Sequence, residues 1–194
     1  MKLNWKPGTM IYPLPSVLVS CGSCPKEYNI MTVAWTGTIC SDPAMCYISV
    51  RKERYSHDII KKNMEFVINL TTEGLAKATD WCGVKSGREY NKFKTMQLTP
   101  GKSKEISAPI IVESPISIEC KVTQIIELGS HDMFMAQVVN VQADDKYLNK
   151  ETGKFDLNQA LPLVYAHGDY YRLGKKIGKF GWSVENKKDN KRRK

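Results

Sequence analysis

Short apolar runs bounded by clusters of turn-forming residues dominate the chain. Runs of this kind that are rich in β-branched and aromatic side chains are typical of β-strands. In residues 116–123 apolar and polar side chains alternate strictly, which indicates a strand with one buried face. The other predicted strands span residues 17–20, 30–36, 45–50, 66–70 and 133–141.

A hairpin and two short helices complete the predicted elements. Residues 128–132 read Leu-Gly-Ser-His-Asp, which favours a tight turn between the last two strands. Ser56 is a suitable N-cap for a helix over residues 56–64, and a second helix is predicted over residues 74–82. Many short strands with brief helical insertions predict a mainly β protein built as an antiparallel barrel.

Positive charge is concentrated at the C-terminal end of the chain. The 194 residues carry a net charge of +9, but residues 172–194 hold ten Lys and Arg against two acidic residues. The remaining residues hold 19 basic and 18 acidic side chains, so the body is nearly neutral. A basic tail can bind nucleic acid, whereas a folded nucleic-acid reader needs its basic patch on the domain itself. We therefore expect one domain over residues 1–174, a basic, disordered tail over residues 175–194, and no nucleic-acid partner.

Signals for membranes, secretion and metals are missing from the sequence. It contains no run of 18 apolar residues and no apolar N-terminal leader, so we expect a cytoplasmic protein without membrane contact. Cys21 and Cys24 form the single C-x-x-C pair among six cysteines, and a structural zinc site needs further ligands. We expect no metal and interpret the pair as ordinary free thiols, with a redox role left open.

Familiar catalytic motifs are missing as well. The sequence has no G-x-S-x-G, H-E-x-x-H or P-loop pattern, and His57, His131 and His167 lack metal-ligand spacing. A hydrolytic triad stays open on composition alone, but no spacing indicates one. If the protein is an enzyme, we expect a cofactor to carry its chemistry.

Residues 49–56 are a candidate anion site. They lead from a predicted strand into a predicted helix and contain Arg51 and Arg54, together with the hydroxyls of Ser49 and Ser56. Guanidinium groups and the free N–H groups of a helix N-terminus both bind phosphate. A solvated basic loop that merely precedes a helix is the alternative.

Residues 29–36 are a candidate site for a flat ring. Polar Asn29 and Thr32 interrupt an otherwise apolar run that ends near Trp35. Apolar walls with a few fixed donors suit a heteroaromatic ligand. The alternative is an ordinary core strand in which Trp35 only packs.

These segments resemble those of the flavin reductase-like, FMN-binding split-barrel family, and within it the flavoredoxins. Further stretches match in the same order, so the resemblance extends from about residue 8 to residue 144 and, more weakly, to residue 174. The matching stretches are residues 29–36, 49–51 with Arg54 and Ser56, 66–70, 80–83 with 86–88 and 92–93, 113–116 with 119–121, and 129–131 with Phe134. The resemblance implies an antiparallel, Greek-key-like split β-barrel with a few short helices.

The resemblance also implies which residues bind FMN. The implied set is Asn29, Ile30, Met31, Thr32, Val33, Ala34, Trp35, Ser49, Val50, Arg51, Arg54, Ser56, Lys92 and His131. Residues 29–35 would meet the isoalloxazine ring, partly through backbone groups, and residues 49–56 would hold the phosphate, with Val50 along the ribityl chain. Lys92 would approach from a loop and His131 from the partner subunit of a homodimer. An aromatic ring near Tyr165 is also implied, and no catalytic side chain is, since the flavin carries the chemistry.

Two functions follow from the resemblance. The leading one is an FMN-dependent oxidoreductase that passes electrons from NADH, NADPH or a reduced protein partner through FMN to an acceptor. The alternative is a flavoredoxin-type electron carrier with no small-molecule turnover. A barrel that binds nucleic acid through its basic tail is the third hypothesis, and the neutral body argues against it.

Overall fold

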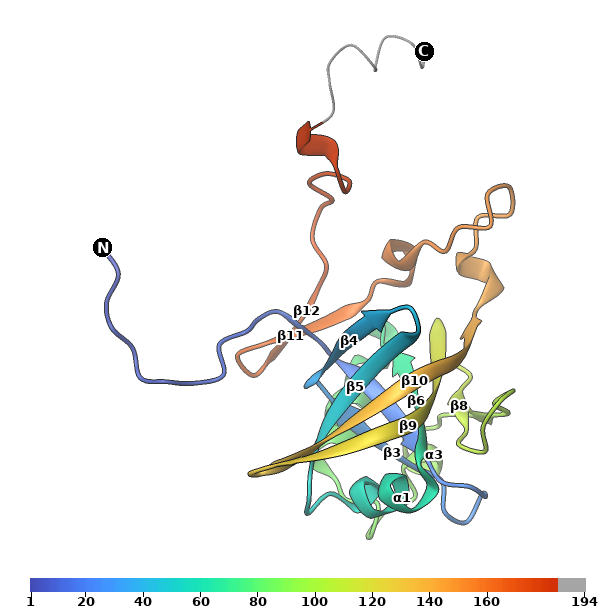
Figure 1. Ribbon diagram of the computed structural model, residues 1–194. Coiled ribbons are helices and arrows are strands. Elements are labelled where there is room, and N and C mark those ends of the chain that lie inside the picture. The colour runs from blue at the N-terminus through green and yellow to red at the C-terminus, as the bar shows by residue number, and fades with distance from the viewer. Residues whose placement is uncertain (185–194) are drawn as a thin grey trace.

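A seven-stranded antiparallel sheet curls into a barrel at the centre of the molecule (Figure 1). The structure is a computed structural model and describes residues 1–184. The strands lie in the order β3-β2-β6-β9-β10-β5-β4. Their bounds are β2 Val17–Cys21, β3 Asn29–Val33, β4 Thr36–Ser41, β5 Ala44–Arg51, β6 Glu65–Leu70, β9 Ile116–Leu128 and β10 His131–Ala143.

The barrel is split where its two edge strands meet. β3 and β4 lie at opposite edges of the sheet, yet only Ala34 and Trp35 separate them in the chain. This short link brings the two edges together, and the amide of Ser49 on β5 donates to the Trp35 carbonyl at 2.8 Å. The single strand predicted over residues 30–36 is therefore wrong, because the chain crosses from one edge to the other within it.

Smaller elements surround the barrel. Strands β1 Leu14–Pro15, β11 Leu163–Ala166 and β12 Asp169–Arg172 form a second sheet, and β7 Pro100–Gly101 pairs with β8 Ile110–Ile111. The α-helices are α1 Tyr55–Asn63, α2 Ala76–Val84 and α3 Lys92–Thr95. The 3₁₀ turns are η1 Glu73–Leu75, η2 Asp145–Tyr147, η3 Leu157–Ala160 and η4 Trp182–Val184. Helix α1 lies across one end of the barrel in Figure 1.

The start of α1 differs from the prediction. Arg54, with extended backbone, occupies the N-cap position, so Ser56 lies inside the first turn and does not cap the helix. Its hydroxyl instead accepts a hydrogen bond from Asn29 Nδ2 at 2.7 Å. The second predicted helix begins as η1 and continues as α2 to Val84, two residues beyond the predicted end.

Two apolar clusters hold these elements together. One fills the barrel and includes Phe66, Phe134 and Ile48, while the other packs β2 and β3 against α2 and includes Leu18 and Ile30. Every residue of β2 is buried because both faces of this strand are covered. Its run is therefore continuously buried rather than alternating, as expected for a strand with no solvent face, and the hydroxyl of its one polar residue, Ser20, donates to the Pro109 carbonyl.

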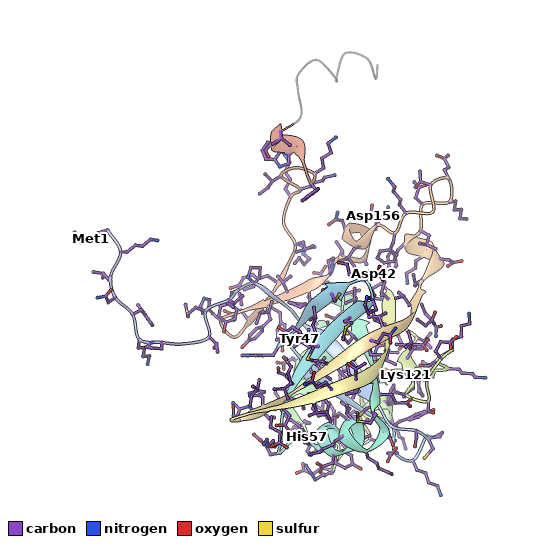
Figure 2. The ribbon with its side chains drawn as sticks, in the orientation of Figure 1. Met1, Asp42, Tyr47, His57, Lys121 and Asp156 are labelled. Carbon is purple, nitrogen blue, oxygen red and sulfur yellow. The ribbon has the colours of Figure 1, made fainter. Side chains whose placement is uncertain are left out.

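Both ends of the chain leave the barrel as extended arms. In Figure 1 the N-terminal arm, residues 1–13, and the C-terminal arm, residues 173–184, project away from the sheet, and Met1 is labelled at one tip in Figure 2. Their exposed side chains include Leu3, Trp5, Ile11, Ile177, Phe180 and Trp182. Within the described residues, every helix is too short or too polar to cross a bilayer. Half of the predicted disordered tail, residues 185–194, lies outside the described residues. The other half, residues 175–184, ends in the 3₁₀ turn η4, and disorder of the tail stays a prediction.

Candidate functional site

Two adjoining cavities run along the split of the barrel. One has a volume of about 480 Å³ and the other about 190 Å³, and both are lined by Met31, Arg51 and Arg54. Together they form a groove, called the split groove below, from the N-terminus of α1 to the corner at Trp35. Every predicted FMN-binding residue lines it except Ile30, whose side chain is buried in the second apolar cluster.

One end of the split groove is cationic. β5 ends at Arg51, and a tight turn in which the Arg54 amide donates to the Arg51 carbonyl at 3.1 Å brings the two guanidinium groups to one place. Arg54 Nη1 donates to the Gly83 carbonyl at 2.8 Å, and Arg51 Nη1 lies 3.5 Å from Glu53 Oε1. Helix α1 starts here without a side-chain cap, so the positive end of its dipole adds to the field.

Lys92 lies at the same end and is buried. The resemblance placed it near the flavin, whereas an isolated Lys is most often a solvated surface residue. Its side chain is 3% exposed, and its ammonium donates to the Cys82 carbonyl at 2.8 Å. Burial lowers the pKa of Lys92 to about 8. The cationic end therefore holds an amine that changes charge within an accessible pH range.

Gly87 lines the cationic end of the split groove and lies very close to Asn29 and Tyr55. A Cβ built on Gly87 would lie 2.2 Å from Asn29 Oδ1 and 2.7 Å from the Tyr55 ring, distances that side chains do not tolerate. Asn29 is itself buried and donates to Ser56. Glycine is therefore required for the loop to approach Asn29. In the sequence, this Ser-Gly-Arg stretch is marked only by the family resemblance.

The other end of the split groove is apolar and aromatic. Met31, Val33 and Ala34 supply walls, while the rings of Trp35 and His131 stack with centroids 6.3 Å apart. His131 was expected from a partner subunit, but its own chain places it here, because β10 pairs with β5 and sets His131 opposite Arg51. Burial, and then Arg51, lower the pKa of His131.

Sequence reasoning missed several residues of this end. Ser16, Gly83, Tyr165 and Tyr170 line the smaller cavity, although only Tyr165 was implied by the resemblance. The Ser16 hydroxyl is buried and has no hydrogen-bond partner among the described residues. No periodicity marks these positions, because Tyr165 and Tyr170 reach the groove from the short sheet β1-β11-β12, Ser16 from the link between β1 and β2, and Gly83 from the end of α2.

The arrangement fits one elongated ligand with two different ends. Guanidinium groups and a helix N-terminus at one end suit a phosphate dianion. Apolar walls with an aromatic rim at the other end suit a planar ring. The alternatives left open by the sequence, a solvated basic loop and an ordinary core strand, do not explain why both segments line one continuous groove.

The family of this chain follows from its similarity to known proteins. The family model described as "Flavin reductase like domain" matches residues 9–174. The chain belongs to the flavin reductase-like family. The family model covers the whole barrel and both sheets that contribute to the split groove.

Members of the flavin reductase-like family with solved structures share the fold. The flavoredoxin of Desulfovibrio vulgaris (Miyazaki F) has a TM-score of 0.88 at 30% identity, over 95% of this chain and all of the other. The flavoredoxin of Methanosarcina acetivorans has a TM-score of 0.85 at 26% identity, with the same coverage. A related protein of Archaeoglobus fulgidus is 31% identical over 158 residues, 81% of this chain and 86% of its own. The predicted resemblance and the split-barrel fold class are confirmed.

The pair Cys21 and Cys24 does not join the site. Cys21 is buried at the end of β2 and Cys24 is exposed in the following turn, and both are free thiols. Burial raises the pKa of Cys21 to about 12, which leaves its thiol protonated at neutral pH. In this flavin reductase-like chain the pair consists of separate thiols in different environments.

Proposed function

We propose that the protein is an FMN-binding oxidoreductase. The observation that carries this proposal is the split groove, in which a cationic end and an aromatic end are joined through Met31, Arg51 and Arg54. FMN has a phosphate at one end and the isoalloxazine ring at the other, so its chemistry matches both ends. Two proteins with similar structures, the flavoredoxin of Desulfovibrio vulgaris and an FMN-binding protein of Thermus thermophilus, support the same assignment.

The phosphate would be held by the turn between β5 and α1. Arg51 and Arg54 offer charge-assisted hydrogen bonds, and Ser56 adds a hydroxyl beside the helix N-terminus. Lys92 adds positive charge at the same end when it is protonated. Ser49 and Val50 on β5 connect this end to the ring site and would line the ribityl chain.

The ring would lie along β3. Bound FMN supplies the redox chemistry, accepting a hydride or electrons from a reduced donor and passing them to an acceptor. The chain's own residues orient the ring between the wall of β3 and the rim formed by Trp35 and His131. Arg51 and Arg54, which also line the smaller cavity, would supply positive charge that favours a reduced, anionic ring.

The electron donor distinguishes two versions of this proposal. In the leading version NADH or NADPH reduces the flavin, and in the alternative a reduced protein does so with no small-molecule turnover. A relative in Moorella thermoacetica named high molecular weight rubredoxin is 29% identical over 138 residues, 70% of this chain and 53% of its own, which supports a protein partner. The nicotinamide version rests on the open aromatic end of the groove.

Anaerobic mixing of the FMN-loaded protein with NADH and then NADPH separates the two versions. The leading version predicts loss of the flavin absorbance with at least one of the two. If neither reduces the flavin while dithionite does, the nicotinamide version is wrong and the electron-carrier version stands. Failure of the protein to retain or bind FMN at all contradicts both.

We also propose that the protein is a homodimer. Large apolar side chains on both arms are exposed in the single chain, including Trp5, Ile177 and Phe180. Soluble proteins rarely leave such surface uncovered, and two-fold pairing is the commonest way to cover it. Sedimentation equilibrium should give about twice the chain mass of 22.0 kDa. A single-chain mass at micromolar concentration contradicts the dimer.

Substitution of Gly87 should damage the phosphate end without unfolding the barrel. In Gly87→Ala the added methyl group displaces Asn29 or the loop, so FMN affinity is expected to fall by about tenfold or more. Titration of flavin fluorescence measures this. The matched control is Gly74→Ala, whose Cβ would meet only Thr72 Oγ1 at an ordinary 3.7 Å, and whose affinity should be unchanged. Equal affinities in the two variants contradict the role given to Gly87.

The pH dependence of FMN binding should report Lys92. Burial lowers its pKa to about 8, and a bound anion raises that pKa, so the complex holds more protons than the free protein. Affinity is therefore expected to be highest below pH 8 and to fall between about pH 8 and the ordinary value of 10.5. Lys92→Met should remove this slope and bind FMN more weakly at pH 7. A slope that survives in Lys92→Met assigns it to another group and contradicts the prediction.

A further inference from the structure

An ionic cluster built on a buried His–Asp pair lies behind the cationic end of the split groove, and its third member, Lys52, is half-exposed. His57 Nε2 lies 2.9 Å from Asp132 Oδ2, and Lys52 Nζ lies 3.3 Å from Asp132 Oδ1. Since an ionised carboxylate only accepts, Nε2 of His57 carries the hydrogen in this contact. His57 is 5% exposed and Asp132 is 1% exposed, and Figure 2 labels His57 at the end of the barrel where α1 lies.

Each member of the cluster directly follows a residue that lines the split groove. Lys52 follows Arg51, His57 follows Ser56, and Asp132 follows His131. On β10 alternate side chains face opposite sides, so His131 faces the groove while Asp132 faces inward, on the same side as Phe134.

The cluster joins three separate segments through one carboxylate. Asp132 belongs to β10, Lys52 to the turn after β5, and His57 to the first turn of α1. The His57 ring also packs edge-on against Phe134, with centroids 5.3 Å apart, so its position is fixed by the core. Any movement of α1 relative to β10 would break the contact with Asp132.

Stability alone does not account for this cluster. Burial opposes ionisation of Asp132, but the hydrogen bond from His57 and the positive charge of Lys52, 3.3 Å away, hold the pKa of its carboxyl below the usual value. Apolar residues of similar volume often replace a buried ion pair with no loss of stability. Asp132 also occupies an inward-facing position of β10, opposite Val50 on β5 and Glu127 on β9. It lies on the same side of the strand as the core residue Phe134, where a hydrophobic side chain would be the ordinary choice.

We propose that Lys52, His57 and Asp132 are positioning residues that make the split groove selective for a phosphorylated flavin. The cluster holds Arg51, Ser56 and the start of α1 at fixed distances from β10, so that the donors converge on one phosphate. A flavin without phosphate gains nothing from that alignment. The inference rests on the proposed function, because it specifies which flavin the same groove takes.

The test compares FMN with riboflavin on variants of the cluster. His57→Phe combined with Asp132→Leu removes the ion pair and keeps the volume apolar. This variant is expected to fold, to bind riboflavin within about twofold of the unmodified protein, and to bind FMN about tenfold or more weakly. Selectivity is measured as the ratio of the two dissociation constants. A general destabilisation of the fold would weaken the binding of both flavins and leave this ratio unchanged, so a change in the ratio is specific to the positioning role.

Two further variants keep the test decisive. His57→Gln retains an N–H donor toward Asp132 and should recover most of the selectivity. Glu119→Gln removes a different fully buried carboxylate, which accepts from the amides of Lys104 and Glu105 away from the groove, and should leave the ratio unchanged. If the double variant does not fold, Asp132→Asn, which preserves shape and removes charge, is measured in its place with the same expectation.

The outcomes separate the two proposals. Equal weakening for FMN and riboflavin, or an unchanged ratio in a folded variant, overturns the positioning role. An unmodified protein that binds riboflavin as well as FMN also overturns it while leaving flavin binding intact. An unmodified protein that binds neither flavin contradicts the proposed function itself, before any variant is made.

Discussion

Replacement of both Arg51 and Arg54 by alanine is expected to weaken FMN binding by about 2–5 kcal/mol. Charge-assisted hydrogen bonds contribute roughly 1.5–3 kcal/mol each, and both guanidinium groups line the cationic end of the split groove. The losses of binding free energy in the two single variants should not add up fully to the loss in the double variant, because each arginine also shapes the turn that positions the other. Fluorescence titration with FMN measures the loss directly.

Riboflavin and a charge-matched variant serve as controls for this prediction. Riboflavin has no phosphate, so its affinity should change by far less than that of FMN in the same double variant. Lys146→Ala with Arg172→Ala removes the same charge from exposed positions outside the groove, and FMN affinity should stay within about twofold. FMN affinity that is unchanged in the Arg51 and Arg54 variant would remove both residues from the site.

Asn69→Ala is expected to lower the free energy of unfolding by about 3 kcal/mol or more. Asn69 is fully buried; its Nδ2 donates to the Leu18 carbonyl at 3.0 Å and to Ser20 Oγ at 2.9 Å. Its Oδ1 accepts from the Ile111 amide at 2.9 Å and from Ser117 Oγ at 2.8 Å. Each polar group left buried and unpaired costs about 1–3 kcal/mol.

Urea denaturation followed by circular dichroism measures the effect of Asn69→Ala. Below the transition the variant should bind FMN normally, because Asn69 joins β6 to β2, β8 and β9 and does not line the split groove as the structure describes it. Asn149→Ala is the matched control, since this residue is exposed and its side-chain Oδ1 accepts from the nearby amides of Glu151 and Thr152. A loss below about 1 kcal/mol in Asn69→Ala contradicts the role assigned to it.

Local patterns in the sequence were enough to place most of the barrel strands. Strict alternation over residues 116–123 marks β9, but only Lys121 and Thr123 of its polar residues meet solvent. Ser117 and Glu119 are buried, because the segments at residues 104–105 and 111 and the neighbouring strands cover that face and bond to them or to Asn69. The break at Ala34 was not predictable from pattern, because Ala34 and Trp35 look like a continuation of an apolar strand. Only closure of the barrel, which is a long-range property, makes the chain change edges there.

The residues of the cationic end were predictable from the sequence to different extents. Arg51, Arg54 and Ser56 lie close in sequence, so their convergence follows from one turn, although α1 begins at Tyr55 and Ser56 does not cap it. Lys92 gives no local sign of burial, since its surroundings come from α2 and β3, which are distant in the chain.

Residues that reach the groove from small flanking elements were the hardest to predict. Tyr170 comes from a strand of only four residues, and Ser16 lies between β1 and β2. The resemblance assigned His131 to a partner subunit, and that contribution stays a prediction; the register of β10 on β5, which sets His131 opposite Arg51 in its own chain, is not readable from the sequence. Each of these positions depends on strand pairing rather than on residue type.

The visible absorption spectrum of the freshly purified protein, with the released cofactor identified by mass, tests the central claim most directly. FMN binding in the split groove predicts a two-band flavin spectrum and the mass of FMN, or the same spectrum after FMN is added to colourless protein. Added FMN should then remain with the protein through gel filtration. A colourless protein that fails to bind added FMN would contradict the account.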